Sequence, residues 1–295
     1  MSFSRVLRSS IHSLLLCGTL SAAGLEAMIW NIEWFPGGNP EPSAAEKSEQ
    51  MKGAKKVLLQ HVPDILLAQE ITDEKAFERL VSAVEGMNVH VFSKFLNFDG
   101  VTPAPQQCVI ASTLELHSGW FEAFKPTKAL PNMPRGFAFA AVKHPDGRLI
   151  MLYSVHLRSN RGDEVPKIAR QIAATRAESV KQLIAHQKVM REKFKNERII
   201  GWVIGGDFNT NHDKQFPLCT AIRDLTAAGF HNSWGNTPRK NRLTWRNHPH
   251  FRNYESTTFD YILTKGFKKT EARLIPNVPR RVSDHAPVML KLISE

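Results

Sequence analysis

Eight polar residues stand where short apolar runs of the sequence end, and their side chains could do chemistry together. They are Asn31, Glu70, His156, Asp207, Asn209, Asp260, Asp284 and His285. Carboxylate oxygens are the ligands that a hard cation such as Mg²⁺ prefers, and histidine can move protons near neutral pH. Taken singly, an Asp or Asn at such a position is more often a turn residue or helix cap. Whether the eight act together depends on the elements that position them.

The spacing of apolar residues predicts short strands separated by helices. The strands are expected at 28–32, 64–68, 89–95, 107–113, 116–124, 137–143, 148–156, 202–204, 258–264 and 286–292. The helices are expected at 43–61, 73–85, 163–194 and 215–228. Ser43 and Glu46 form a capping box at the start of the first helix. A turn at 145–147 joins two strands into a hairpin.

Strands outnumber helices but alternate with them, which predicts an α/β (α+β) protein with mixed sheets faced by helices. The sequence has no internal repeat and no low-complexity linker. We therefore expect a single domain over residues 25–295.

The first 23 residues have the pattern of a secretory signal peptide. Arg5 and Arg8 precede the apolar run 11–20, and the small residues at 21–23 offer a cleavage site. The run is shorter than the roughly 20 apolar residues that span a bilayer. We expect a secreted or periplasmic protein without stable membrane insertion, although an N-terminal helix or anchor would fit the same residues.

Composition indicates an ordinary globular protein with an excess of base. Its 295 residues are 42% hydrophobic and 23% charged, with a formal charge of +11, which excludes disordered, collagen-like and coiled-coil classes. Loss of residues 1–23 removes Arg5 and Arg8 and no acid, leaving +9. Cys108 and Cys219 lie in apolar stretches without zinc-ligand spacing, so they read as core residues, and whether they pair is left open.

The residues that flank the eight polar positions favour a shared function over separate turn or cap roles. In chain order they read Trp-Asn-Ile-Glu-Trp, Ala-Gln-Glu, Ser-Val-His-Leu, Gly-Gly-Asp-Phe-Asn, Phe-Asp-Tyr-Ile and Ser-Asp-His-Ala-Pro-Val. This series resembles the endonuclease/exonuclease/phosphatase family, whose fold is deoxyribonuclease I-like, from residue 29 to about residue 290. The resemblance implies a four-layer sandwich of two mixed β-sheets flanked by helices, with the site at one edge where strand ends meet.

The resemblance also implies a metal site, with Mg²⁺ as the expected ion and Mn²⁺ or Ca²⁺ as alternatives. Glu70 would be the principal ligand, and Asn31 and Asp284 would lie near the same ion. A phosphodiester is anionic and repels hydroxide, so a cation and fixed donors lower the barrier by neutralising charge that grows in the transition state.

The other roles that the resemblance implies concern proton transfer and phosphate binding. His285 would contact the scissile phosphate and transfer a proton, oriented by Asp260. Asp207 would position or deprotonate the attacking water or serve the leaving oxygen, and Asn209 would donate to the phosphate. His156 resembles a second histidine found in deoxyribonuclease I and sphingomyelinase-type members.

Two further positions bear on phosphate contact and proton transfer. Arg135 precedes the strand at 137–143, where family members often place a phosphate-contacting Arg, although it could be an exposed charge that flanks a strand. Gln107 stands upstream with no nearby Glu to partner His156, which puts the proton-transfer role of His156 in question.

The segment 235–258 offers a substrate surface, because basic residues alternate with aromatic ones just before Asp260. Such a pattern suits a phosphate backbone and stacked bases, although a solvated basic loop would have the same composition. Arg242, Trp245 and Arg246 are its expected substrate contacts.

These observations predict an Mg²⁺-dependent phosphoric ester hydrolase, specifically a monomeric nuclease that hydrolyses DNA. A lipid phosphodiesterase of the sphingomyelinase kind would need an exposed apolar hairpin, which Phe92, Phe95, Leu96 and Phe98 could supply. A phosphomonoesterase of the same family is a further alternative. A catalytically inactive binding module would be expected to lack a ligand or a histidine.

Overall fold

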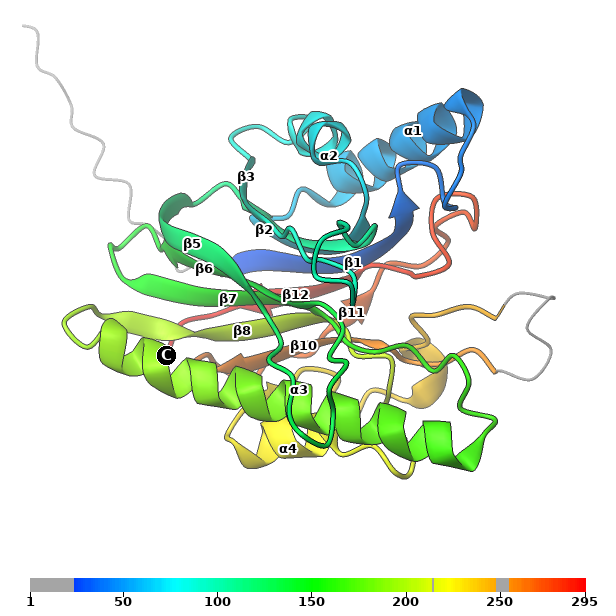
Figure 1. Cartoon of the computed structure of the whole chain (residues 1–295). Helices are drawn as coiled ribbons and strands as arrows, with labels where there is room; N and C mark the ends of the chain where they lie inside the picture. Colours follow the sequence, from blue (N-terminus) through cyan, green and yellow to red (C-terminus); the bar gives the residue numbers. More distant parts are fainter. Residues whose placement is uncertain (1–23, 214, 248–254) are drawn as a thin grey trace, which may run out of the picture.

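The computed structural model describes residues 24–213, 215–247 and 255–295, so the expected signal peptide lies outside the described residues. Within them the strands form two six-stranded sheets that pack face to face (Figure 1). The first sheet has the order β11 (Arg273–Leu274), β12 (Val288–Leu292), β1 (Leu25–Phe35), β2 (Ile65–Ile71), β4 (Gln107–Ser112) and β3 (Asn88–Phe92). The second has the order β5 (Glu115–Ala123), β6 (Gly136–Lys143), β7 (Leu149–His156), β8 (Ile199–Asp207), β10 (Asp260–Lys265) and β9 (His231–Asn232).

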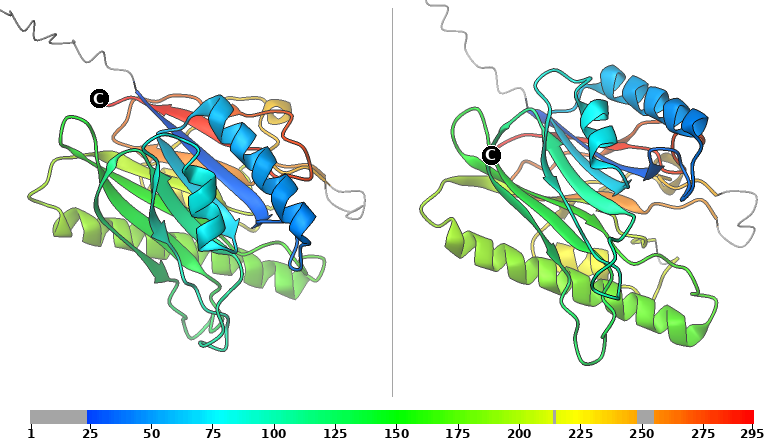
Figure 2. Two further views of the ribbon diagram at one scale, coloured as in Figure 1. Left: turned by 90° about the horizontal axis from the view of Figure 1, so that it is seen from above. Right: turned by 45° about the horizontal axis from the view of Figure 1, so that its top comes forward.

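Helices cover the outer face of each sheet. Helices α1 (Ala44–His61) and α2 (Glu74–Val81) lie on the first sheet, whereas α3 (Pro166–Lys193) and α4 (Ala221–Ala227) lie on the second. Figure 2 shows the same four layers from two other directions. A short 3₁₀ turn, η1 (Arg239–Asn241), precedes β10. The predicted four-layer sandwich of two mixed sheets is therefore confirmed.

Alternating side chains of β1 explain how one sheet serves two packing interfaces. Ala27 and Ile29 belong to the core between the sheets, and Met28 and Trp30 belong to a second core beneath α1 and α2. All four are fully buried. Because successive side chains of a strand point to opposite faces, a strand buried on both sides must be apolar at every position. The continuous apolar run at 27–30 is the sequence signature of this arrangement.

Each sheet contains one parallel pair near its centre, and the other pairs are antiparallel. β1 runs parallel to β2, and β7 runs parallel to β8. β12 runs antiparallel to β1, with its first residue Val288 opposite Ile29. β10 runs antiparallel to β8, with its first residue Asp260 opposite the last residue Asp207. Four strand ends and two strand starts therefore meet at one edge of the sandwich.

The helices begin and end at residues whose side chains satisfy the free backbone groups. Ser43 caps α1, and Glu46 completes the predicted capping box by accepting from the Ser43 N–H at 2.8 Å. Asp73 caps α2 by accepting from the Ala76 N–H at 2.9 Å. The helix expected over 215–228 is shorter, because it spans only Ala221–Ala227.

Two short strands were not predicted, because runs of two residues carry no periodic signal. β9 pairs with β10, and β11 pairs with β12, so both extend sheets that longer strands had already formed. No helix among the described residues is both long and apolar enough to cross a bilayer.

Two glycines let the second sheet approach its neighbours closely. A Cβ on Gly205 would lie 2.5 Å from Cγ2 of Ile29 in the first sheet. Gly206 has a φ of +150°, and a Cβ there would lie 1.9 Å from the carbonyl oxygen of Val155 in the adjacent strand. These positions immediately precede Asp207, so the backbone that carries this carboxylate cannot tolerate a side chain.

We predict that Gly206→Ala lowers the free energy of unfolding by about 3 kcal/mol, because backbone atoms of β7 would have to move. The matched control is Gly147→Ala, in an exposed turn with φ +83° and open space at the Cβ position. It should cost only about 1 kcal/mol for the left-handed backbone. Urea-induced unfolding measures both. Equal losses in the two variants would contradict the close approach.

Candidate active site

The eight polar residues come together because of the strand order. Asn31 and Glu70 lie near the ends of the parallel strands β1 and β2, and His156 and Asp207 end the parallel strands β7 and β8. Asp260 begins β10 and pairs directly with Asp207 across the ladder. Of the remaining three members, Asn209 follows β8, and Asp284 and His285 precede β12. The sandwich therefore gathers at one edge residues that lie up to 254 positions apart in the sequence.

Irregular backbone turns the Glu70 side chain toward this edge. The β2 pairing shifts register between Ala68 and Ile71, and Glu70 itself has a φ of +62°. A second irregularity interrupts β1 after Asn31, where Glu33 and Trp34 also have positive φ. Such bulges redirect side chains and are common beside active sites. Left-handed conformations of residues other than glycine are costly and persist where surrounding contacts enforce them.

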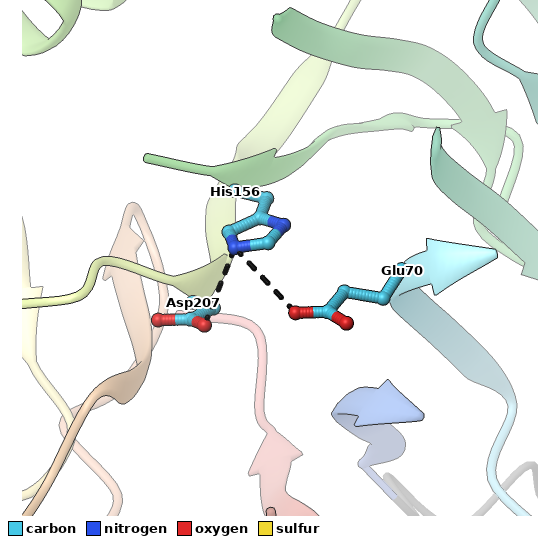
Figure 3. A group of neighbouring side chains, drawn as sticks. All are labelled: Glu70, His156 and Asp207. Carbon is cyan, nitrogen blue, oxygen red and sulfur yellow. Dashed lines mark ion pairs between the residues drawn. The ribbon is translucent and has the colours of Figure 1, made fainter. Parts of the chain in front are cut away.

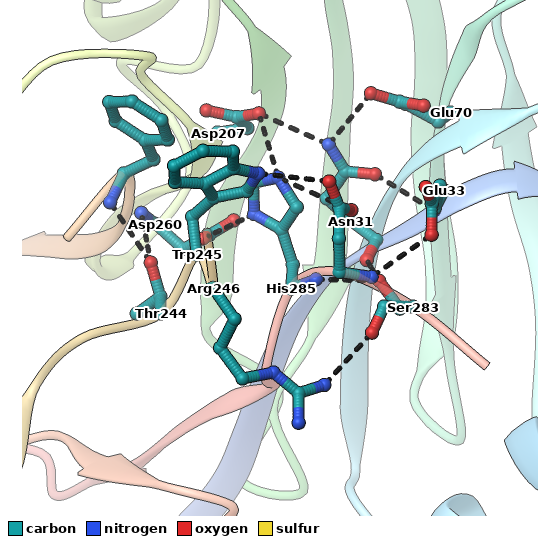
Figure 4. Close-up of polar contacts among 12 residues, drawn as sticks. Asn31, Glu33, Glu70, Asp207, Thr244, Trp245, Arg246, Asp260, Ser283 and His285 are labelled. Carbon is teal, nitrogen blue, oxygen red and sulfur yellow. Dashed lines mark hydrogen bonds and ion pairs between the residues drawn. The ribbon is translucent and has the colours of Figure 1, made fainter. Parts of the chain in front are cut away.

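Asn31 joins two of the carboxylates. Its Nδ2 donates to Glu70 Oε1 at 3.0 Å and to Asp207 Oδ2 at 3.1 Å, and its Oδ1 accepts from the Glu33 N–H (Figure 4). Asn31 is fully buried and does not line the cavity described below. In this structure Asn31 therefore links the Glu70 and Asp207 carboxylates by hydrogen bonds without lining the cavity itself.

His156 faces the same two carboxylates. Its Nε2 lies 3.5 Å from Asp207 Oδ2 and 3.9 Å from Glu70 Oε1 (Figure 3). Its buried Nδ1 has no hydrogen-bond partner among the described residues. Gln107, which the sequence analysis considered as a neighbour of His156, instead accepts hydrogen bonds from Ser93 Oγ and the Phe95 N–H.

His285 and Asp260 form a buried pair. Asp260 Oδ2 lies 2.7 Å from His285 Nδ1, while His285 Nε2 faces Asp207 Oδ2 at 3.8 Å and Asp284 Oδ1 at 3.8 Å. Thr244 fixes the start of β10, because its Oγ1 accepts from the Asp260 N–H at 3.1 Å. The ring is thus oriented by one carboxylate and presents Nε2 to two others.

Three groups hold Asp284 in place. Trp245 Nε1 donates to Asp284 Oδ2 at 2.9 Å, and the Asp284 N–H donates to Glu33 Oε2 at 3.0 Å. Arg280 forms an ion pair with Glu33 and lies 4.0 Å from Asp284 Oδ2. The orientation of Asp284 is therefore determined by side chains from three separate segments.

Burial and neighbouring carboxylates raise the pKa values of Glu70 and Asp207. Burial and the nearby Asp284 raise the pKa of Glu70 to about 7. Burial raises the pKa of Asp207 to about 6, with a further contribution from Asp260 that His285 opposes. Both carboxyls are therefore poised to exchange a proton, or to bind a cation in its place, near neutral pH.

The two histidines shift in opposite directions. Burial lowers the pKa of His156 well below its ordinary value, and the charges of Arg135 and His285 lower it further. Burial also disfavours the charged form of His285, but Asp260, Asp284 and Asp207 raise its pKa well above the ordinary value. At neutral pH His156 is thus a neutral acceptor and His285 a charged donor, a division typical of acid–base pairs.

These groups open onto a cavity of about 1030 Å³. Of the predicted site residues, the cavity is lined by Glu70, Arg135, His156, Asp207, Asn209, Trp245, Asp284 and His285. Among the described residues, five carboxylates and two guanidiniums line it, the carboxylates being Glu70, Asp163, Asp207, Glu255 and Asp284. A phosphate would meet net negative charge there unless a cation were bound.

Arg135 and Asn209 line the cavity but already have partners. Arg135 donates from Nε to the carbonyl of His156 and from Nη2 to the carbonyl of Leu157, both at 2.9 Å. The Asn209 side chain donates to the same Leu157 carbonyl at 3.2 Å. Both residues support the segment that follows His156, and their predicted phosphate contacts remain predictions.

Arg242 and Arg246 do not lie where the sequence analysis expected them. Arg242 is buried and forms a two-pronged ion pair with Asp213. Neither Arg242 nor Asp213 lines the cavity. Arg246 donates to the carbonyl of Ser283 at 2.9 Å and is likewise absent from the cavity wall. Both guanidiniums are used to anchor the 235–247 segment. The part of the predicted basic loop at 248–254 lies outside the described residues.

Several residues of the site were not singled out from the sequence. Glu33 and Trp34 stand in the quoted Trp-Asn-Ile-Glu-Trp run, so their nearness to Asn31 was a usable signal. Phe216 and Phe259 form part of the cavity wall, and Arg280 supports Asp284. Phe259 stands in the quoted Phe-Asp-Tyr-Ile run, and Arg280 lies only four positions before Asp284, so both had a usable signal. None of the quoted motifs includes Phe216.

Comparison with protein families finds one match that covers most of the chain. The model of the endonuclease/exonuclease/phosphatase family matches residues 28–285. Sequence comparison with curated proteins finds no match.

Solved structures share the fold at low sequence identity. The human Nocturnin catalytic domain, with bound sulfate, is 16% identical with a TM-score of 0.64, over 92% of this chain and 95% of that one. A mannosyl-6-phosphatase of Bacteroides thetaiotaomicron is 15% identical with a TM-score of 0.63, over 91% and 99%. Truncated TDP2 of Caenorhabditis elegans is 16% identical with a TM-score of 0.62, over 93% and 99%. At these identities the likeness extends to the fold alone.

We predict that Asp260→Asn lowers the pKa of His285, because the variant removes the carboxylate that faces Nδ1 while burial of the ring remains. Imidazole ¹⁵N shifts followed across pH by NMR report this change. The control Asp146→Asn removes an exposed carboxylate elsewhere and should leave His285 unchanged. If His285 titrates identically in both variants and in the parent, Asp260 does not stabilise the charged ring.

Proposed function

We propose that this chain, which belongs to the endonuclease/exonuclease/phosphatase family, is a divalent-metal-dependent nuclease that hydrolyses the phosphodiester bonds of DNA. The observation that carries the proposal is the pairing of a carboxylate–histidine cluster with an aromatic wall in one cavity. Trp245 and Phe259 line this wall with ring centroids 5.7 Å apart. Aromatic faces of this kind stack nucleobases beside a reacting phosphate.

The donor set fits a divalent cation. Glu70, His156 and Asp207 offer ligand atoms that all lie within 4.8 Å of one another, and so do Asp207, Asp260 and His285. Asp260 already holds the His285 ring, and Asp207 is kept for proton transfer. The carboxylates of Glu70 and Asp284, which are electrostatic neighbours, are therefore the groups that would hold the ion, which we take to be Mg²⁺. A bound divalent cation would neutralise charge on the phosphate and polarise it.

The protein's own residues then divide the remaining work. Asp207, with a pKa of about 6, is mostly ionised at neutral pH and can accept a proton from the attacking water. His285, kept protonated by its carboxylate neighbours, can donate from Nε2 to the phosphate or to the leaving oxygen. Trp245 keeps Asp284 oriented through its indole N–H, so the wall that would stack a base also positions a carboxylate.

A lipid phosphodiesterase is the second candidate, because apolar side chains are exposed close to the cavity. Leu96 is 48% exposed, Phe98 67% and Val101 79%, whereas Phe95 of the same predicted hairpin is buried. A small hollow lined by Leu96 and Phe98 reaches Arg135 at the cavity rim. These side chains could enter a membrane surface next to the site.

We predict that Glu70→Gln and His285→Ala each lower the rate of DNA hydrolysis about 100-fold or more, which is the usual loss for a removed acid–base or cation-binding group. Exposed Glu78→Gln and His117→Ala are the matched controls and should retain parental rates. Plasmid nicking in Mg²⁺, repeated with a chelator, is the assay, and the chelator should abolish activity.

The same preparations should be given RNA, sphingomyelin vesicles and a phosphomonoester. Turnover of sphingomyelin without nicking would replace the nuclease by the lipid phosphodiesterase. Full activity of both site variants on every substrate would refute the proposed site.

We also propose that residues 1–23 direct export to the periplasm or the medium and are then removed. The support is the order of Arg5 and Arg8, an apolar run and small residues at 21–23. N-terminal sequencing of the exported protein should begin close to residue 24. Recovery of the full-length N-terminus from the cytoplasm alone would refute export.

A further inference from the structure

We infer that a side chamber of the cavity is a binding pocket for one unpaired nucleobase of the substrate. The side chamber is the space of about 200 Å³ between helix α3 and the segment 215–219. Its apolar lining consists of Ala169, Ile172, Ala173, Phe216, Pro217 and Leu218. The charged groups Arg176 and Asp163 also line it. The inference rests on the proposed function, because it names the part of a nucleic acid that the site would recognise.

The side chamber adjoins the cavity that holds the catalytic groups. Asn160, Asp163, Gln215 and Phe216 line both spaces. A substrate whose phosphate lies beside His285 would therefore have to pass only these shared residues to reach the side chamber.

A row of rings connects the two spaces. The Phe259 ring lies 6.5 Å from the His285 ring on one side and 5.7 Å from the Phe216 ring on the other, measured between centroids. The guanidinium of Arg176 lies 5.9 Å from the Phe216 centroid. The row thus runs from a catalytic imidazole to a cation in the side chamber. Planar groups of a substrate can stack along such a row.

Arg176 is held rigidly and is nearly inaccessible. It is 1% exposed, and it donates from Nε to the carbonyl of Arg158 and from Nη2 to Asn160 Oδ1, both at 2.7 Å. Asn160 in turn donates to the carbonyl of Asn209 at 2.8 Å. The Arg176 guanidinium therefore has a defined position relative to the catalytic cluster and contributes a fixed positive charge to the wall of the side chamber.

The charges of the side chamber favour a neutral polar ring over a second phosphate. Arg176 brings one positive charge, but the Asp163 carboxylate lines the same space and opposes an anion. Two of the Arg176 donor nitrogens are already bonded to protein oxygens. A nucleobase suits these surroundings, since its faces are apolar enough to pack against Phe216 and Ile172 while its edge carries both acceptors and donors.

The dimensions require the base to be unpaired. A space of about 200 Å³ enclosed by a helix and a loop cannot admit a base pair that is still stacked in a duplex. A base reaches such a pocket only from a single strand or by leaving the stack. We therefore expect single-stranded DNA, or an unpaired end, to be preferred over intact duplex.

The test measures base-dependent binding separately from hydrolysis. A labelled single-stranded DNA octamer and the same strand built wholly from abasic residues are titrated by fluorescence anisotropy. The protein is the full chain carrying His285→Ala, with Mg²⁺ present, so that the strand is not cleaved. The intact strand should bind about tenfold or more tightly than the abasic one, as expected when a base stacks on an aromatic ring.

Two neighbouring alanines of α3 provide the variant and its control. Ala173 is buried and lines the side chamber, whereas Ala174 is exposed and does not line it. Ala173→Leu fills the chamber and should abolish the preference for bases, while Ala174→Leu should retain it. Phe216→Ala, which removes the opposite wall, should also reduce the preference for the intact strand over the abasic one. If thermal melting shows that Ala173→Leu is unfolded, the Phe216→Ala result is used in its place.

Several outcomes would overturn the inference. They are equal binding of the two strands, no measurable binding of either, or a base preference that survives both Ala173→Leu and Phe216→Ala. If Ala173→Leu weakens the binding of both strands equally, the side chamber holds phosphate instead of a base.

Hydrolysis is measured on chains that retain His285, so base-dependent binding without any hydrolysis would refute the nuclease and leave the chamber supported. Hydrolysis without base-dependent binding would support the nuclease and refute the side chamber as a base pocket.

Discussion

The crowding of buried carboxylates where both sheets end is the constraint on which the rest of the site depends. Glu70, Asp207, Asp260 and Asp284 converge there. Burial raises the pKa of Glu70 and of Asp207, and repulsion from Asp284 raises the first further and from Asp260 the second. The surrounding protein offsets this repulsion locally. Asn31 donates to two of the four, Trp245 donates to a third, and His285 carries a positive charge among them. The site is therefore a balance of charges, and a cation fits naturally into it.

The close packing of the two sheets makes this convergence possible. Gly205 and Gly206 allow β8 to approach both the first sheet and β7, and Asp207 follows directly. Positive φ values at Glu33, Trp34 and Glu70 lie at the same edge. Regular strands would point these side chains along the pleat, whereas the irregular ends turn them inward. The backbone cost is confined to the ends of strands whose other residues form two extensive cores.

The contacts of the basic side chains in the structure change the interpretation of their excess in the sequence. Arg242 forms an ion pair with Asp213, and Arg239 forms one with Glu255. Arg246 donates a hydrogen bond to the carbonyl of Ser283. Their charges stabilise the 235–247 segment and hold Trp245 against Asp284. The substrate contacts that we propose among the described residues are instead the aromatic wall and the side chamber.

The fold class, most strand positions and the polar residues at the strand ends could be predicted from the sequence. These features depend on local patterns, namely apolar runs, caps and turns, together with short motifs that a family resemblance could identify. Which of these residues share a cavity became clear from the packing in three dimensions. Arg242 lies 29 positions from Asp213, and Trp245 lies 39 positions from Asp284. No local pattern distinguishes a guanidinium that meets a buried carboxylate from one that faces solvent, because packing between distant segments selects the partner.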